Sequence, residues 1–109
     1  MYANKIGCTV YERAVENRME AYVPHFIPAV YWEDTTAQVQ TGTSMKQQDQ
    51  IWCCIPSGSL SGYVPRKDDI IVCGRYDSAE PPESGRTITA VEDYRYGSAG
   101  VQHIEVTAV

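Results

Sequence analysis

A chain of 109 residues with 43% hydrophobic and 21% charged residues has the composition of one globular domain, which excludes a disordered protein and a separate cofactor domain. Nine Lys and Arg against fourteen Asp and Glu give a net charge of −5, and the cations form no stripe, so binding to nucleic-acid phosphates is not expected. No apolar run reaches the roughly 18 residues of a membrane span or forms a signal peptide, so we expect a protein made in the cytoplasm and kept there unless an assembly carries it elsewhere.

The first part of the chain predicts a strand and, in competition with it, a short helix. Lys5–Arg13 alternates apolar and polar residues, which is the pattern of a half-buried strand. From Glu12 to Tyr22 the apolar residues instead recur at helical spacing, and Pro24 follows as a stop. This pattern favours a helix of two or three turns, which would depend on packing against a sheet.

The next part predicts two strands and a polar link. His25–Glu33 is apolar with Pro28 in its middle, so we expect an edge strand that is bent or bulged at the proline. Thr36–Gly42 alternates cleanly and predicts another strand. The polar residues 43–49 are interpreted as a link to the centre of the fold.

The fold is organised around Asp49–Gly74, which contains two short apolar strands, Ile51–Ile55 and Ile70–Cys73. Side chains alternate between the two faces of a strand, and both faces of the first strand are apolar. One face carries Ile51, Cys53 and Ile55, and the other carries Trp52 and Cys54. One face can fill a core, and the other must be covered by the same chain or by another subunit. Between the strands, Ser57–Gly62 is predicted to protrude as a loop or hairpin tip.

The segment between the central strands ends in four charged residues, Arg66 to Asp69, which we interpret as a turn of solvated charges with local capping. Arg75–Gly85 contains two prolines and two glutamates and predicts an exposed loop. Arg86–Tyr94 and Val101–Val109 predict strands of a final hairpin, the second with Ile104, Val106 and Ala108 facing inward and His103, Glu105 and Thr107 facing outward. The whole predicts a single all-β domain, residues 1–109, built as a small barrel or sandwich of about seven strands with at most one short helix.

The sequence shows no catalytic signature and predicts no cofactor or metal. The four cysteines all lie in predicted strands and there is no secretory signal, so buried reduced thiols are favoured over a zinc site. The only bases suited to neutral pH are His25 and His103. Their pairing with Cys53 or Cys54 is the sharpest enzymatic hypothesis, although no nearby positive charge or helix end would lower the pKa of either thiol.

The chain contains, in order, the segments VYER, AVYW, DQIWCCIP, YVPRKDDIIVCG and VEDYRYGSAGVQHIEV. This order of segments resembles that of the small minor capsid or neck proteins of tailed bacteriophages, of the head-closure or head–tail joining type. The matching positions are Ile55, Pro56, Asp69, Ile71, Val72, Gly74, Asp93, Gly97, Ser98 and His103. The chain departs from the pattern where Asp68 replaces a glycine and where Ile104 replaces an aromatic residue.

The resemblance implies a structural virion protein, not an enzyme: a β-barrel subunit that forms a ring between portal and tail, located in the virion neck and, before assembly, in the host cytoplasm. The implied partners are other copies of the chain, portal or adaptor and tail proteins, and DNA that passes through the lumen without specific binding, with no membrane. We expect the joining surfaces in the loops Ser57–Arg66 and Tyr76–Arg86, with Trp32 and Trp52 as anchors; the interface residues expected are Trp32, Trp52, Ser57, Gly58, Ser59, Leu60, Ser61, Gly62, Tyr63, Glu80, Pro81 and Pro82. The alternative is a monomeric small-barrel module that binds a peptide or small ligand in an aromatic groove.

Overall fold

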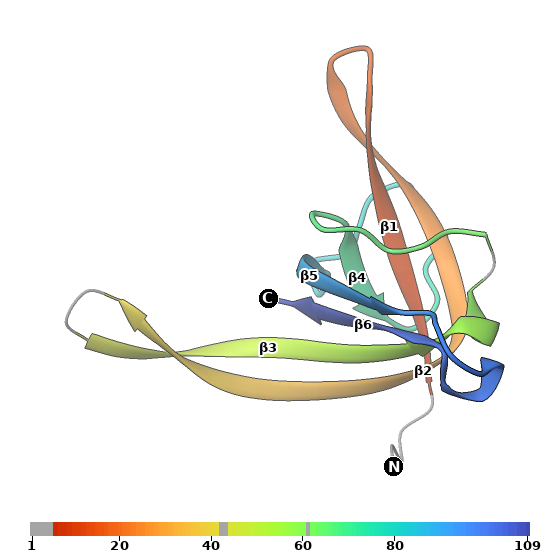
Figure 1. Cartoon of the computed structure of the whole chain (residues 1–109). Helices are drawn as coiled ribbons and strands as arrows, with labels where there is room; N and C mark the ends of the chain where they lie inside the picture. Colours follow the sequence, from red (N-terminus) through yellow and green to blue (C-terminus); the bar gives the residue numbers. More distant parts are fainter. Residues whose placement is uncertain (1–5, 42–43, 61) are drawn as a thin grey trace.

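The computed structural model describes residues 6–41, 44–60 and 62–109. These residues form six antiparallel strands and two single-turn 3-10 helices, namely β1 (Ile6–Glu16), β2 (Met19–Thr41), β3 (Ser44–Pro56), η1 (Ser57–Ser59), β4 (Ile70–Cys73), β5 (Arg86–Tyr94), η2 (Ala99–Val101) and β6 (His103–Ala108). The strands neighbour one another in the order β1-β2-β3-β6-β5-β4, and β4 pairs back onto β1, so the sheet closes into a small barrel (Figure 1). The predicted all-β class is confirmed, with six strands in the described chain where about seven were expected.

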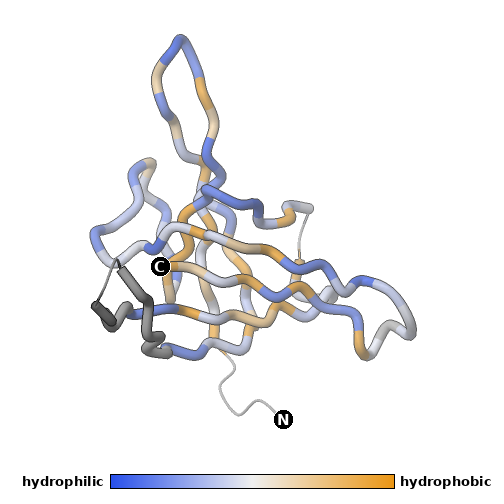
Figure 2. Tube along the Cα trace, turned by 60° about the vertical axis from the view of Figure 1, so that its left-hand side comes forward, coloured by the Kyte–Doolittle hydropathy of each residue, from blue (hydrophilic) through white to orange (hydrophobic). Residues whose placement is uncertain are grey.

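The core lies inside this barrel and is filled by alternate residues of the strands. In β6 the inward residues Ile104, Val106 and Ala108 are fully buried, as predicted, and Ile51, Cys53 and Ile55 of β3 belong to the same cluster. Hydrophobic residues accordingly concentrate along the barrel strands (Figure 2). Each large aliphatic side chain buried in this way contributes about 1.5–3 kcal/mol to stability.

The helix expected over Glu12–Tyr22 is wrong, because β1 continues to Glu16 and turns directly into β2. Asn17 and Arg18 have φ angles of 51° and 65°, the left-handed pair of a two-residue turn whose twist suits a hairpin. Val15 and Met19, which a helix would have packed on the sheet, are 68% and 71% exposed. A helix this short has no packing surface here, whereas the hairpin gains a regular backbone ladder.

The long strand β2 changes partner at the bend that Pro28 predicted. Its residues up to Val30 pair with β1, those from Tyr31 pair with β3, and the register with β1 shifts between Ile27 and Val30, around Pro28. The predicted strand Thr36–Gly42 is the end of β2, apart from Gly42, which lies outside the described residues. The predicted polar link is wrong from Ser44 onward, because these residues form the first part of β3 and satisfy their backbone groups by pairing with β2.

Two hairpins project from the barrel in different directions, one formed by β1 and β2 and one by β2 and β3 (Figure 1). They extend the molecule to 45 × 42 × 22 Å and raise its radius of gyration to 14.7 Å. A compact domain of this length would have a radius of about 13 Å.

The segment Ser57–Gly62, expected to protrude, instead turns through η1, and Leu60 packs against the core. Ser61 lies outside the described residues. The segment lies against the barrel because the apolar side chains of Leu60, Tyr63 and Val64 are each partly buried there. No helix in the described chain is long and apolar enough to cross a membrane.

Candidate functional site

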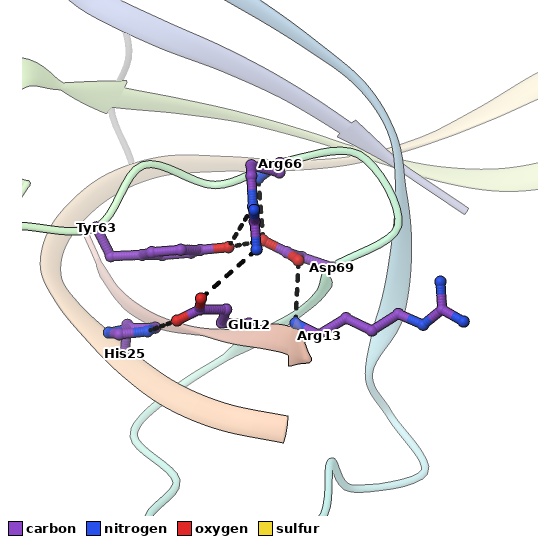
Figure 3. A network of polar contacts seen from close by, with 6 residues as sticks. All are labelled: Glu12, Arg13, His25, Tyr63, Arg66 and Asp69. Carbon is purple, nitrogen blue, oxygen red and sulfur yellow. Dashed lines mark hydrogen bonds and ion pairs between the residues drawn. The ribbon is translucent and has the colours of Figure 1, made fainter. Parts of the chain in front are cut away.

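A polar network fastens the segment before β4 to the barrel, with Asp69 at its centre (Figure 3). The Asp69 side chain is 1% exposed. It accepts hydrogen bonds from the backbone N–H of Arg13 at 3.2 Å, from the backbone N–H of Arg66 at 3.0 Å and from the Tyr63 hydroxyl. These three hydrogen bonds replace those that the carboxylate would make to water, so they offset the free-energy cost of burying its charge.

The backbone of Asp68 and Asp69 completes this anchor by pairing with β5. The N–H of Asp68 donates to the carbonyl of Ile88 at 2.9 Å, and the N–H of Ile88 donates to the carbonyl of Asp69 at 2.8 Å. The interpretation of both aspartates as solvated turn charges is therefore right for the exposed Asp68 and wrong for Asp69. Asp68 has a φ of 78°, a left-handed conformation, and this turn directs the next side chain inward.

The outer part of the network joins the loop to the first hairpin. The Tyr63 ring stacks on His25 with 4.2 Å between centroids, and Arg66 Nε donates to the Tyr63 hydroxyl at 3.2 Å. Glu12 lies between the basic groups, with Oε1 2.8 Å from His25 Nε2 and Oε2 3.5 Å from Arg66. Partial burial and the bond to Asp69 raise the pKa of Tyr63 to about 12, so its hydroxyl remains a donor at neutral pH.

A second cluster lies on the outer face of β3, β6 and β5. The Glu105 carboxylate accepts from Trp52 Nε1 at 3.2 Å and lies 3.0 Å from His103 Nε2, while His103 Nδ1 lies 2.8 Å from the carbonyl oxygen of Val101. Both ring nitrogens of His103 thus face acceptors, first the Val101 carbonyl and then Glu105, and these raise its pKa. Tyr94 stacks on the ring at 5.0 Å.

A hollow of about 380 Å³ opens beside this cluster and is lined by Tyr31, Cys54, Pro56, Gly100, Val101, Gln102 and His103. It brings together Cys54 and His103, one of the cysteine–histidine pairs considered from the sequence. Their arrangement differs from that of an activated thiol, because both nitrogens of His103 are engaged elsewhere. Burial and Glu105 moreover raise the pKa of the Cys54 thiol, the direction opposite to activation.

The other thiols follow the predicted burial with one exception. Cys8, Cys53 and Cys54 are buried, whereas Cys73 at the end of β4 is exposed. The expectation of a buried Cys73 is wrong because β4 ends there and Gly74 turns the chain away. In the described part of the chain no three His, Cys, Asp or Glu side chains are placed to hold a metal ion.

The expected interface residues are spread over separate parts of the surface. Trp32 packs against the core cluster, whereas Trp52 bonds to Glu105 on the outer face. Glu80, Pro81 and Pro82 lie in the predicted loop, which the structure confirms and ties down through the Ser78 hydroxyl and the Gly85 N–H. Ser57, Gly58 and Ser59 form η1, and the Tyr63 side chain is engaged in the Asp69 network, so only part of the Ser57–Arg66 loop faces solvent.

Sequence reasoning missed both projecting hairpins as candidate contact elements. A signal for the first was present in Asn17, since asparagine tolerates the left-handed backbone of a tight turn. In the second hairpin the returning strand begins with residues 44–50, of which only Met45 is apolar, so it gives no apolar alternation to detect.

Comparisons with curated proteins and with solved structures give no significant match. A family profile matches residues 4–109, and its description is a family of unknown function, DUF6751. Because this match covers nearly the whole chain, the protein belongs to the DUF6751 family.

Proposed function

We propose that the protein is a structural subunit that self-associates into a ring between the portal and the tail of a tailed bacteriophage. In this role it closes the filled head, joins it to the tail and lets DNA pass. The proposal unites the resemblance of the sequence to neck proteins with a β-barrel that carries long projecting hairpins.

The observation that carries the proposal is the ribbon formed by residues 35–41 of β2 and 44–50 of β3, here called the arm. Seven consecutive residue pairs join its strands, from Thr35 with Gln50 to Thr41 with Ser44. At about 3.3 Å per residue the arm extends for about 23 Å. In the described chain no third strand pairs with either side, because β1 stops pairing with β2 at Val30 and β6 pairs with β3 only from Ile51.

Such an arm favours pairing with another protein chain. A lone two-stranded ribbon is at best marginally stable in water, and exposed strand edges are usually protected by proline, lysine or a bulge. Residues 35–50 contain no proline and a single lysine, Lys46. Addition of the arm to a strand of a neighbouring subunit would satisfy its backbone edges, which is a common mode of association between β-proteins.

The charge of the chain is compatible with a passage for DNA. A net charge of −5 repels phosphates, so a ring of such subunits would let the duplex slide without holding it. The ring is also the type of assembly expected when one surface of a subunit binds a different surface of the next.

The test is removal of the arm with the barrel left intact. Thr35 and Gln50 are directly paired, so residues 36–49 can be replaced by Asn-Gly, a two-residue turn that keeps their register. The arm-less protein should remain folded, with a thermal midpoint within about 3 °C of the wild type, because an unsupported ribbon adds little stability. Light scattering and native mass spectrometry should show that the wild type forms rings with portal protein and the arm-less variant does not.

The matched control shortens the other hairpin. Ala14 and Ala21 are also directly paired, so residues 15–20 can be replaced by the same Asn-Gly turn. This variant should still self-associate. Ring formation by the arm-less variant, or a wild type that stays monomeric with portal protein, would contradict the proposal.

The hollow beside Tyr31 and His103 favours the second candidate, a monomeric module that binds a peptide or small ligand. Its size is in the range of small-molecule pockets and it has aromatic and polar groups on its walls. On this hypothesis removal of the arm leaves the function unchanged, whereas Val101→Arg at the exposed wall of the hollow abolishes ligand binding.

A further inference from the structure

Two cysteines on neighbouring strands lie opposite each other at one end of the barrel. Cys8 of β1 and Cys73 of β4 are direct partners in the antiparallel ladder. The next pair, Gly7 and Gly74, is hydrogen-bonded, with the Gly74 N–H donating to the Gly7 carbonyl at 2.9 Å. Hydrogen-bonded and non-bonded pairs alternate in such a ladder, so Cys8 and Cys73 form a non-bonded pair.

This position suits a disulfide. Directly opposed residues point to the same face of the sheet, and in a non-bonded pair their Cα atoms are about 4.5 Å apart, inside the range that disulfides span. Cys73 is exposed and Cys8 is buried, so one thiol is open to a soluble oxidant and its partner lies directly behind it. A third thiol, that of Cys53, lies near Cys8 in the core.

We propose that Cys8 and Cys73 are an oxidation site at which a low-molecular-weight disulfide creates a cross-strand bond between β1 and β4. First, the Cys73 thiolate attacks the small disulfide, which forms a mixed disulfide and releases one small thiol. Cys8 then attacks the Cys73 sulfur while its proton passes to the departing small thiolate, which forms the protein disulfide and releases the second thiol. Two protein thiols are oxidised and one small disulfide is reduced, so the electrons balance.

The bond would lock the barrel at its smallest strand. β4 is held by four residue pairs with β1 and only two with β5, so the closure of the barrel depends on this short element. Linking residues 8 and 73 closes a long loop, and long loops lose most entropy from the unfolded chain when they are cross-linked. The inference does not depend on the proposed function, because it concerns the barrel alone.

The experiment incubates purified protein with oxidised glutathione at mildly alkaline pH. Partial burial, with Cys8 and Asp34 nearby, raises the pKa of Cys73, so its thiolate is scarce at neutral pH. Intact mass should fall by about 2 Da, as expected when two thiols become one disulfide. Peptide mapping should recover residues 8 and 73 in one linked peptide, and the thermal midpoint should rise by about 5–10 °C.

Single substitutions separate this bond from the alternatives. Cys73→Ser, at an exposed position, should fold normally and abolish the internal bond, whereas Cys54→Ser should leave it unchanged. A Cys8–Cys53 linkage, a stable glutathione adduct on Cys73, or a dimer linked through Cys73 would each overturn the proposal. The proposal would also be overturned if all four cysteines remained free thiols after incubation with the oxidant while the protein stayed folded.

Discussion

The Asp69 network makes a sharp prediction, because two adjacent aspartates differ in burial and can be changed in the same way. Asp69→Asn keeps the shape of a side chain that is 1% exposed and accepts three hydrogen bonds. Asp68→Asn makes the identical chemical change at an exposed residue, and asparagine tolerates the left-handed backbone there. We expect the first to destabilise the fold strongly and the second to have little effect.

The magnitude follows from the contacts. A hydrogen bond to a charged group contributes about 1.5–3 kcal/mol, and a buried donor left without an acceptor loses its full desolvation energy. The amide that replaces the Asp69 carboxylate can accept through one atom only, so the Arg13 N–H or the pair formed by Tyr63 and Arg66 would face an amino group. The expected loss is about 3 kcal/mol of a total stability of about 5–15 kcal/mol. For a domain of this length that corresponds to a fall of about 10–15 °C in the thermal midpoint.

The assay is urea unfolding followed by tryptophan fluorescence, with thermal unfolding by circular dichroism as a second measurement. The difference between the two variants, rather than either value alone, isolates burial and hydrogen bonding from the loss of one negative charge. If Asp69→Asn unfolds within about 0.5 kcal/mol of Asp68→Asn, which is the range of ordinary surface substitutions, the carboxylate does not anchor the loop.

Two further predictions concern the outer face and the first hairpin. The acceptors around His103 raise its pKa above the ordinary value of 6.5, so its stabilising contribution is complete below pH 6.5 and is lost as pH rises through the folded value. NMR titration of the imidazole should show a pKa above the ordinary value in the folded protein, and the fall in thermal midpoint between acid and neutral pH should be smaller in His103→Gln. The titratable groups around the ring are Glu105, Glu92, Tyr94, Cys54 and Tyr31. A folded pKa at or below the ordinary value would refute the prediction. At the turn, Arg18→Gly should raise stability by about 0.5–1 kcal/mol, because its φ of 65° suits glycine, whereas Arg18→Lys should not. Equal midpoints for the two variants would show that the backbone at Arg18 is not strained.

The parts of the fold that could be predicted have a buried face or end at a residue, such as glycine, that favours a turn. β4 and β5 have the bounds that the sequence indicated, because apolar runs are closed there by Gly74 and opened after Gly85. β6 was predicted by its alternation, which burial against the core makes visible. Residues 12–22 could not be assigned in the same way, since Val15 and Met19 are exposed and their helical spacing reflects no packing.

The candidate site was less predictable than the fold. That Asp69 rather than Asp68 enters the barrel wall depends on the left-handed backbone of Asp68, which no local pattern reveals for an Asp-Asp pair. The arm was missed because residues 44–49 are mostly polar and were interpreted as a link, while their pairing depends on residues earlier in the chain. The partners of His103 are two residues to either side in sequence, but its closeness to Cys54 depends on the register of β3 and β6.

The most direct test of the assembly role is electron microscopy of phage particles from a genome that encodes this protein. Particles made without it, and particles supplied only with the arm-less variant, should have filled or leaking heads that lack tails, whereas the wild-type protein should restore tailed particles. Normal tailed particles in the absence of the protein would contradict the proposed role in joining head and tail.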